Sequence, residues 1–294
     1  MKIYSAKNSY YRISVSTLGA ELTSMKSANG FEHIWQKNGD WHDQAPLLFP
    51  VCGRIKDKKY TYKGVEYPMN AHGFAKQSEF SLVEATDTRI VMELKANEET
   101  KKVYPFNFSL TASYELSGDE LIFTATVKNG GEDTLPYMFG WHPGFNLETD
   151  GKVDINDYKL DFAGVESLNW FVLQNGPFVN PDSKPYPLTE NAYQLSEEEI
   201  YPNDTMIFTG HKNKTTLHAD GAAFTLDFSW SDNLPYLCIW KEEFNEAKYI
   251  CLEPWSDVPA DGVADENFDT RKMRRLAPGE SASYTYKVKA YFKK

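Results

Sequence analysis

Hydrophobic and polar residues alternate with a period of two along much of the chain. Residues 11–15 are an early example, and 106–116 and 121–127 are longer ones on either side of a Ser-Gly-Asp-Glu turn. Alternation of this kind is typical of β-strands with one buried face. The segments that we predict to be strands are 11–15, 20–25, 31–35, 80–85, 89–94, 106–116, 121–127, 206–208, 215–218, 223–230, 236–240, 249–252 and 283–292.

Two regions lack this alternation and are predicted to be irregular. Residues 40–75 contain three prolines, although 60–67 within them indicate a tight hairpin around Lys63 and Gly64. Residues 150–203 contain five prolines, and we predict loops there with one helical turn at 197–199, capped by Ser196.

No other helix, no internal repeat and no Gly- or Ser-rich linker is evident in the sequence. About twenty strands in one sheet would have to fold over into layers. The sequence therefore predicts an all-β protein with very little helix, in which residues 1–294 form one domain.

Composition and charge exclude several classes of partner. The formal net charge is −11 and the pI is about 5.1, so no basic field is present to attract nucleic acid or an anionic membrane surface. Aromatic residues make up 15% of the chain, which suits a large β core and also a site that stacks on sugar rings.

The three cysteines, Cys52, Cys238 and Cys251, are odd in number and form no C-x-x-C pair, which argues against a disulfide framework or a zinc knuckle. The first residues contain no apolar segment typical of a secretory signal, and no apolar run reaches membrane-spanning length. We therefore expect a cytoplasmic protein without a membrane partner.

A histidine interrupts the strand-like segment 137–146. His142 follows Trp141 and precedes Pro143 and Gly144, which should end or bulge the strand. A histidine there can transfer protons near neutral pH. A structural histidine packed in the core would show the same pattern.

Four further residues occupy loop or strand-end positions next to proline, glycine or aromatic residues. Glu253 ends an apolar strand before Pro254, where burial would raise its pKa and make it a base, unless it only caps a turn. Arg54 is a candidate clamp or a salt-bridge residue, and Asp204 is a ligand group or an Asx turn. His72 lies in the loop 70–74.

Other kinds of site find little support. No Ser/His/Asp order, no G-x-S-x-G motif and no phosphate-binding glycine loop is present. His72, His142 and Glu253 could together hold a metal, but three distant segments offer no ligand spacing to test, and we expect no catalytic metal.

Six segments, taken together, resemble the aldose 1-epimerase (galactose mutarotase) family, and the LacX-like branch most closely. They occur in the family's order and span nearly the whole chain: 49–54 (FPVCGR), 70–74 (NAHGF), 141–145 (WHPGF), 202–208 (PNDTMIF), 252–255 (LEPW) and 276–280 (LAPGE).

The resemblance implies a large antiparallel β-supersandwich and an enzyme that interconverts the α and β anomers of a free aldose such as galactose or glucose. It implies that His142 protonates the ring oxygen and that Glu253 takes the proton of the anomeric hydroxyl, from opposite sides of the sugar. The sugar-binding residues that it implies are Arg54, His72 and Asp204, with Gln44 as a looser candidate.

No cofactor is expected for this reaction, because no electrons or groups leave, and the chain is expected to be a monomer or a homodimer. The sequence departs from the galactose-active enzymes at Cys52-Gly53-Arg54, where Asn-Gly-Arg is usual. The nearby Lys56, Lys58 and Lys59 leave a phosphorylated sugar open. The sequence also leaves open a non-catalytic carbohydrate-binding or sensing protein, which the acid/base pair argues against, and a lyase or hydrolase on a related fold.

Overall fold

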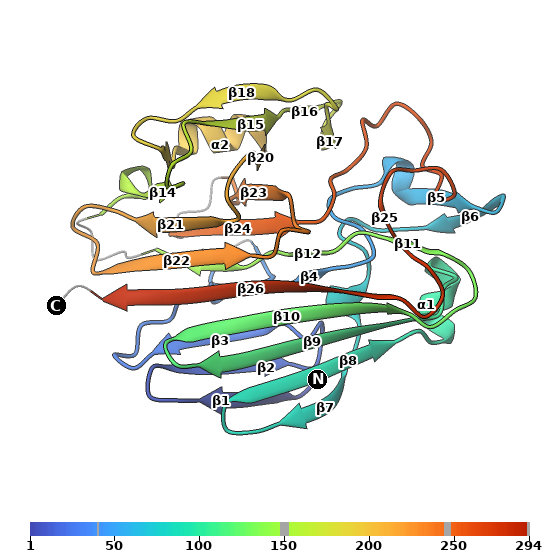
Figure 1. Cartoon of the computed structure of the whole chain (residues 1–294), viewed down its shortest axis with the longest axis horizontal. Coiled ribbons are helices and arrows are strands. Elements are labelled where there is room, and N and C mark those ends of the chain that lie inside the picture. Colours follow the sequence, from blue (N-terminus) through green and yellow to red (C-terminus); the bar gives the residue numbers. More distant parts are fainter. Residues whose placement is uncertain (40, 148–152, 244–247, 293–294) are drawn as a thin grey trace.

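Antiparallel β-strands make up most of the molecule (Figure 1). The computed structural model describes residues 1–39, 41–147, 153–243 and 248–292. Strands account for 49% of the residues and helices for 8%, which confirms the prediction of an all-β protein with very little helix.

The larger sheet contains nine strands, and those labelled in Figure 1 follow one another from the bottom to the top of the view. Their order is β7 (Ser81–Ala85), β8 (Arg89–Lys95), β9 (Phe108–Ser117), β10 (Glu120–Asn129), β26 (Ser281–Phe292), β22 (Phe224–Trp230), β21 (Lys214–His218), β14 (Lys159–Asp161) and β19 (Ala192–Gln194).

A second sheet of eight strands carries the site described below. Its order is β18 (Lys184–Pro187), β15 (Ser167–Phe171), β20 (Thr205–Thr209), β23 (Tyr236–Trp240), β24 (Tyr249–Trp255), β12 (Gly140–Trp141) and β4 (Leu47–Leu48), and β13 (Gly144–Asn146) also pairs with β24.

The remaining elements are small. The strands are β1 (Ile3–Lys7), β2 (Tyr11–Ser16) and β3 (Leu22–Ser27) in one sheet, and the pairs β5 (Lys59–Tyr62) with β6 (Val65–Pro68), β11 (Leu135–Tyr137) with β25 (Arg274–Leu276), and β16 (Leu173–Gln174) with β17 (Phe178–Val179). The helices are α1 (Glu98–Val103) and α2 (Glu197–Asn203), with 3₁₀ turns at Lys56–Lys58, Ala75–Gln77 and Ile155–Asp157.

Aromatic side chains fill the space between the two large sheets. The ring of Trp141 on β12 lies 4.9 Å from that of Phe123 on β10 and 5.4 Å from that of Tyr286 on β26. The Tyr286 hydroxyl donates to the carbonyl oxygen of Pro254 on β24. The two sheets therefore pack face to face over a common core, which confirms the expected antiparallel supersandwich.

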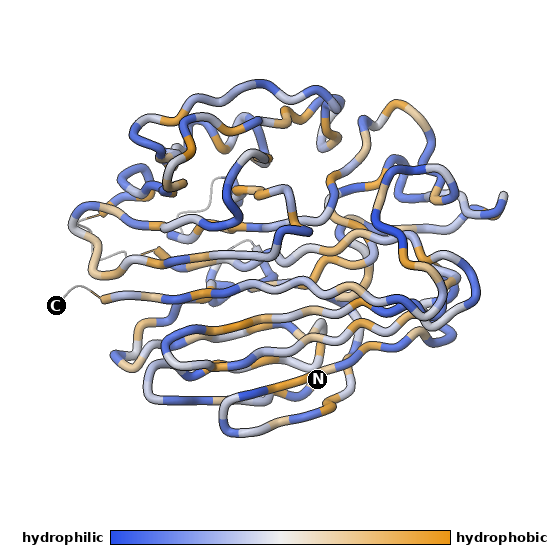
Figure 2. Tube along the Cα trace, in the orientation of Figure 1, coloured by the Kyte–Doolittle hydropathy of each residue, from blue (hydrophilic) through white to orange (hydrophobic). Residues whose placement is uncertain are grey.

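The alternating pattern of the sequence correctly identified most long strands. In β9 and β10 nearly every second residue is buried, and hydrophilic and hydrophobic segments follow one another closely along such strands (Figure 2). The hairpin around Lys63 and Gly64 is also present, as β5 and β6. The alternating pattern predicts these strands correctly because one face of each strand packs against the core.

Some predictions were wrong in detail. Residues 31–35 form only isolated bridges, and the region 150–203, expected to consist of loops, contains six short strands, β14–β19. These strands have two to five residues each, too few to show a period. Asp40 and residues 150–152 of the two predicted irregular regions lie outside the described residues.

The helices differ from the predictions for local reasons. The predicted turn at 197–199 is the start of α2, which continues to Asn203, and Ser196 is its N-cap residue but makes no side-chain cap hydrogen bond in the described structure. Helix α1 was not predicted. Its N-terminus is stabilised by a capping box, in which the side chains of Asn97 and Thr100 each accept a hydrogen bond from the other's backbone N–H. The alternation of hydrophobic and polar residues does not reveal such a cap.

Candidate functional site

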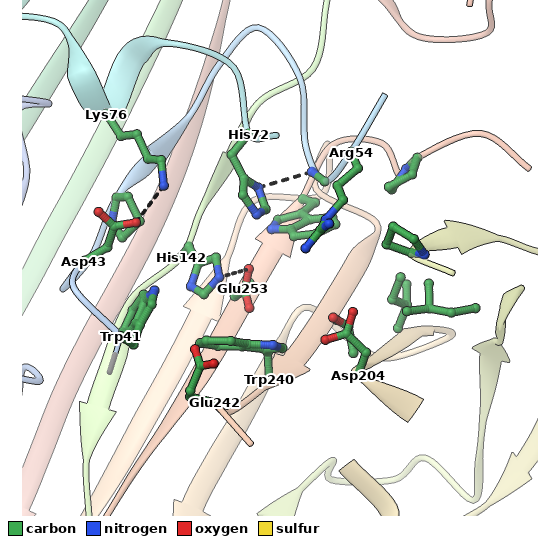
Figure 3. A pocket seen from close by; sticks show the side chains of 18 residues that line it. Trp41, Asp43, Arg54, His72, Lys76, His142, Asp204, Trp240, Glu242 and Glu253 are labelled. Carbon is green, nitrogen blue, oxygen red and sulfur yellow. Dashed lines mark hydrogen bonds and ion pairs between the residues drawn. The ribbon is translucent and has the colours of Figure 1, made fainter. Parts of the chain in front are cut away.

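A cavity of about 360 Å³ opens on the face of the eight-stranded sheet that points away from the core (Figure 3). Five of the six residues expected in the site line it. They are Arg54, His72, His142, Asp204 and Glu253.

The pairing of β24 with β12 and β13 brings His142 and Glu253 together. Gly140 pairs with Trp255 and Gly144 pairs with Cys251, so the same register continues across the break at His142 and Pro143. In this register His142 lies directly opposite Glu253, and opposite residues of an antiparallel pair point to the same face. The predicted interruption at His142-Pro143 is present, while Glu253 lies inside β24 and not at its end.

The imidazole of His142 contacts the carboxyl group of Glu253 at the floor of the cavity. His142 Nε2 lies 3.2 Å from Glu253 Oε2, and the two residues are 7% and 1% exposed. Burial lowers the pKa of His142 well below its ordinary value, and His72 adds to this effect. Burial also raises the pKa of Glu253 well above its ordinary value, and the carboxylate of Asp204 adds to the increase.

Two glycines beside His142 make room for indole rings. A Cβ atom on Gly144 would lie 2.5 Å from Trp41 Cζ3, and one on Gly140 would lie 2.6 Å from Trp255 Cδ1. The Trp41 ring stacks on His142 with centroids 5.1 Å apart and planes at 29°. These contacts fix the orientation of the imidazole and exclude water around it.

His72 reaches the cavity from a loop and has a defined tautomer. Its pKa is lowered to about 3 by burial and, less strongly, by Lys76, so the ring is neutral near pH 7. The backbone N–H of Gly53 donates to His72 Nδ1 over 3.2 Å. A neutral ring that accepts at Nδ1 carries its proton on Nε2, so His72 offers a hydrogen-bond donor.

Arg54 and Asp204 stand on the exposed rim of the cavity (Figure 3). Asp204 follows α2 with φ 59° and ψ −68°, an unusual conformation for a non-glycine residue. Neither side chain has a hydrogen-bond or ion-pair partner within the described ranges. A guanidinium and a carboxylate without protein partners can bind the hydroxyl groups of a ligand.

Gln44 does not join these residues. Its side-chain amide donates to the carbonyl oxygens of Thr23 and Trp35, each over 2.8 Å, and it is absent from the residues that line the cavity. Its backbone carbonyl accepts from the N–H of Gly144. Gln44 therefore supports the strand that carries His142 from behind.

Several lining residues had no signal in the sequence. Trp41 and Trp240 line the cavity, and Lys76 forms an ion pair with Asp43 over 2.6 Å at its edge. Trp240 lies opposite Cys251 on the neighbouring strand, so only the strand pairing would have revealed it. Of the aromatic residues in the six family-like segments, Trp255 lines the cavity, whereas Trp141 and Phe74 pack against the core.

Comparison with known proteins identifies the family. The family model described as aldose 1-epimerase matches residues 2–289, which is nearly the whole chain. The chain belongs to the aldose 1-epimerase family. The relationship suggested by the six sequence segments is thereby confirmed.

Proteins with similar sequences include the plasmid and chromosomal LacX proteins of Lactococcus lactis subsp. lactis. Each is 29% identical over 296 residues, covering 96% of this chain and 97% of the relative.

Solved structures of aldose 1-epimerase relatives share the fold. A galactose mutarotase related enzyme from Lactobacillus acidophilus is 30% identical with a TM-score of 0.91, covering 99% of this chain and 97% of the other. A galactose mutarotase-like protein from Lactobacillus casei ATCC 334 is 26% identical with a TM-score of 0.90, covering 99% and 100%. None of the helices in the described residues has the length and apolar character needed to span a membrane.

Proposed function

We propose that the protein is an aldose 1-epimerase that interconverts the α and β anomers of an unphosphorylated aldose such as glucose or galactose. The observation that carries this proposal is the buried 3.2 Å contact between His142 Nε2 and Glu253 Oε2 at the floor of a cavity lined by hydrogen-bonding groups. Family membership supports the same reaction class.

The two groups lie side by side, not on opposite sides of a sugar as the sequence had led us to expect. This arrangement suits the anomeric centre, because the ring oxygen and the anomeric hydroxyl oxygen are bonded to the same carbon. A sugar placed with that carbon over the pair can contact both groups at once. In the proposed reaction the His142 imidazolium protonates the ring oxygen while the Glu253 carboxylate takes the hydroxyl proton.

Burial makes the ion pair that the proposed first step requires the less populated form of the His142–Glu253 pair. The pair with one mobile proton exists either as imidazole with carboxylic acid or as imidazolium with carboxylate. Ring opening converts the second form into the first, which burial favours because neither group is then charged. Rotation about the C1–C2 bond and the reverse transfers close the ring from the other face and restore the ion pair.

The remaining lining residues account for sugar binding in this proposal. His72 Nε2–H donates to a hydroxyl oxygen, and Arg54 and Asp204 bind further hydroxyl groups at the rim. The indoles of Trp41, Trp240 and Trp255 provide apolar surface for the C–H face of the ring.

The charges around the cavity favour an uncharged sugar over a sugar phosphate. Lys56, Lys58 and Lys59 are not among the described residues that line it, and Lys56 and Lys59 pair with Asp265 and Glu66. Lys76, which does line it, is already paired with Asp43. We therefore propose that a phosphate group is not part of the preferred substrate.

Polarimetry on freshly dissolved α-D-glucose and α-D-galactose tests the function. We expect the wild type to accelerate mutarotation, and His142→Asn and Glu253→Gln each to lower kcat by about 10²–10⁴, the usual effect of one positioned proton transfer. The matched controls are His42→Asn and Glu115→Gln, which change exposed residues outside the cavity lining and should leave kcat within about twofold.

A parallel panel of sugar phosphates checks the substrate class, and thermal unfolding checks that each variant folds. Wild-type rates in both His142→Asn and Glu253→Gln would overturn the assigned chemistry. Sugar binding by calorimetry without any acceleration by the wild type would instead identify a non-catalytic binding or sensing protein.

A further inference from the structure

A third potential ligand atom lies beside the His142–Glu253 pair. The imidazole of His142, the thiol of Cys251 and the carboxyl group of Glu253 each offer one donor atom, and these atoms all lie within 4.8 Å of one another. All three residues are buried, with exposed fractions of 7%, 0% and 1%. Cys251 has no role in the proposed epimerase reaction.

The sheet itself holds these three groups together. Cys251 and Glu253 are two residues apart on β24 and so point to the same face. Glu253 lies opposite His142, and Cys251 lies opposite Gly144, where the Trp41 ring packs closely. Three donor groups on two paired strands are rigidly placed, so little conformational entropy is lost when an ion binds.

Nitrogen, sulfur and oxygen are the donor set of zinc-like ions, which bind them at about 2.0–2.3 Å. Two such ligands around one tetrahedral ion are separated by about 3.3 Å, close to the 3.2 Å between His142 Nε2 and Glu253 Oε2. Glu253 Oε2 has no hydrogen-bond partner within the described structure, although it is buried. The donor set thus fits an ion, and two of its three residues, His142 and Glu253, line the cavity.

The charge of the cavity also favours a cation. The ionisable residues other than histidine that line it comprise four acids, Asp43, Asp204, Glu242 and Glu253, and two bases, Arg54 and Lys76. The surrounding indoles exclude water and so strengthen the attraction between an ion and its ligands.

We propose that His142, Cys251 and Glu253 form a binding site for one thiophilic divalent cation, such as Zn²⁺ or Cd²⁺, and that an ion bound there stops catalysis. The Cys251 thiol loses its proton to solvent as the metal–sulfur bond forms. His142 and Glu253 then use the lone pairs that would have carried protons to and from the sugar. The inhibition rests on the proposed epimerase function, whereas the binding does not.

Titration of chelator-treated full-length protein with Cd²⁺ tests the site. Calorimetry should give one ion per chain, and ultraviolet absorption should show the thiolate-to-cadmium charge-transfer band. Cys251→Ala should abolish the band and weaken binding by at least about tenfold, as should His142→Asn. The matched control is Cys238→Ala, which removes another fully buried thiol that lies opposite Glu253 on β23 but outside the donor group.

Polarimetry with and without Cd²⁺ gives a ratio of rates for each variant, so differences in basal rate do not matter. The ratio should fall in the wild type and in Cys238→Ala, and fall much less in Cys251→Ala. Absence of Cd²⁺ binding, or equal binding and an equal band in Cys251→Ala, would overturn the site. Binding at the site with an unchanged rate would overturn the inhibition. Absence of metal-free activity in the wild type would count only against the epimerase function.

Discussion

The imidazole of His142 is held on every side by groups that leave it one productive orientation. The Trp41 ring stacks on it, the Trp240 ring meets it edge-on with centroids 5.4 Å apart, and His72 meets it edge-on at 5.6 Å. Nε2 therefore points to Glu253. A side chain locked by packing can pass a proton without first losing rotamer freedom.

Gly144 permits the Trp41 ring to pack on His142, and replacing Gly144 should disturb this packing. Gly144→Ala places a Cβ atom 2.5 Å from the Trp41 ring, which must move off His142. We expect a loss of about 1–3 kcal/mol in the free energy of unfolding, as for other overpacked sites, together with a lower kcat/KM. Urea unfolding and polarimetry measure the two effects.

Gly130→Ala is the matched control, because the nearest atom to its new Cβ would be the Asn107 carbonyl oxygen at an ordinary 3.7 Å. It should change neither quantity appreciably. Equal unfolding midpoints and equal kcat/KM for the two variants would contradict the role of Gly144.

The strand pair β12 and β24 provides the chemistry, while helix α2 positions one of the binding groups. Asp204 immediately follows α2, which is tied to Lys241, the residue after β23, by a partly buried network. Lys241 Nζ donates to the Tyr201 hydroxyl over 2.8 Å and lies 3.2 Å from Glu197 Oε1. Lys241 is 2% exposed, and burial lowers its pKa.

Lys241→Met should therefore affect binding more than turnover. The methionine keeps most of the side-chain length but removes the charged hydrogen bonds, at a cost of about 1.5–3 kcal/mol in the free energy of unfolding. We expect KM to rise several-fold because Asp204 loses its fixed position. The change in kcat should be smaller, because Glu253 lies on β24 and His142 directly follows β12. Initial-rate polarimetry over a range of sugar concentrations separates the two constants.

Lys102→Met removes a comparable lysine–glutamate pair, with Glu99 on the exposed face of α1, and serves as its control. That variant should keep both constants. A fall in kcat at constant KM in Lys241→Met would argue against a positioning role for Lys241.

The limits of the sequence appear most clearly at the level of elements. His142 and Glu253 could be singled out because each is a titratable residue in an apolar strand next to a proline. Their contact could not be predicted from the sequence pattern, because it depends on the register between β12 and β24, which the alternation of residues does not specify. For the same reason Trp240 and Cys251 were missed. Gln44 was expected at the binding edge, but it does not line the cavity. The short strands β14–β19 were not predicted, because pairing with neighbouring strands defines them and their own sequences show no clear alternation.

In the molecule as a whole, burial of neutral histidines makes stability depend on pH. His33 is fully buried among Phe31, Phe224 and Phe292, and burial lowers its pKa to about 4. The ring is not among the described residues that line the cavity, so its titration should affect folding and not catalysis.

The unfolded chain gives His33 an ordinary pKa of about 6.5 and so binds the proton more tightly than the folded protein. Stability should therefore be full above pH 6.5 and decline as the pH falls towards about 4, by up to ~3 kcal/mol from this residue. His33→Gln should show a shallower decline over this interval when the unfolding free energy is measured by urea at several pH values. His42→Gln, at an exposed histidine, should follow the wild type, and parallel curves for His33→Gln and the wild type would contradict the prediction.

The uninterrupted register across the break at His142-Pro143 has a consequence for how such a protein can be altered. The floor of the cavity is built from paired strands whose spacing admits no insertion, since one added residue would turn the following side chains to the other face. The rim residues Arg54 and Asp204 lie outside the strands, where no strand register fixes the direction of the side chain. To change the sugar specificity, one would therefore replace residues of the rim and keep the paired strands of the floor.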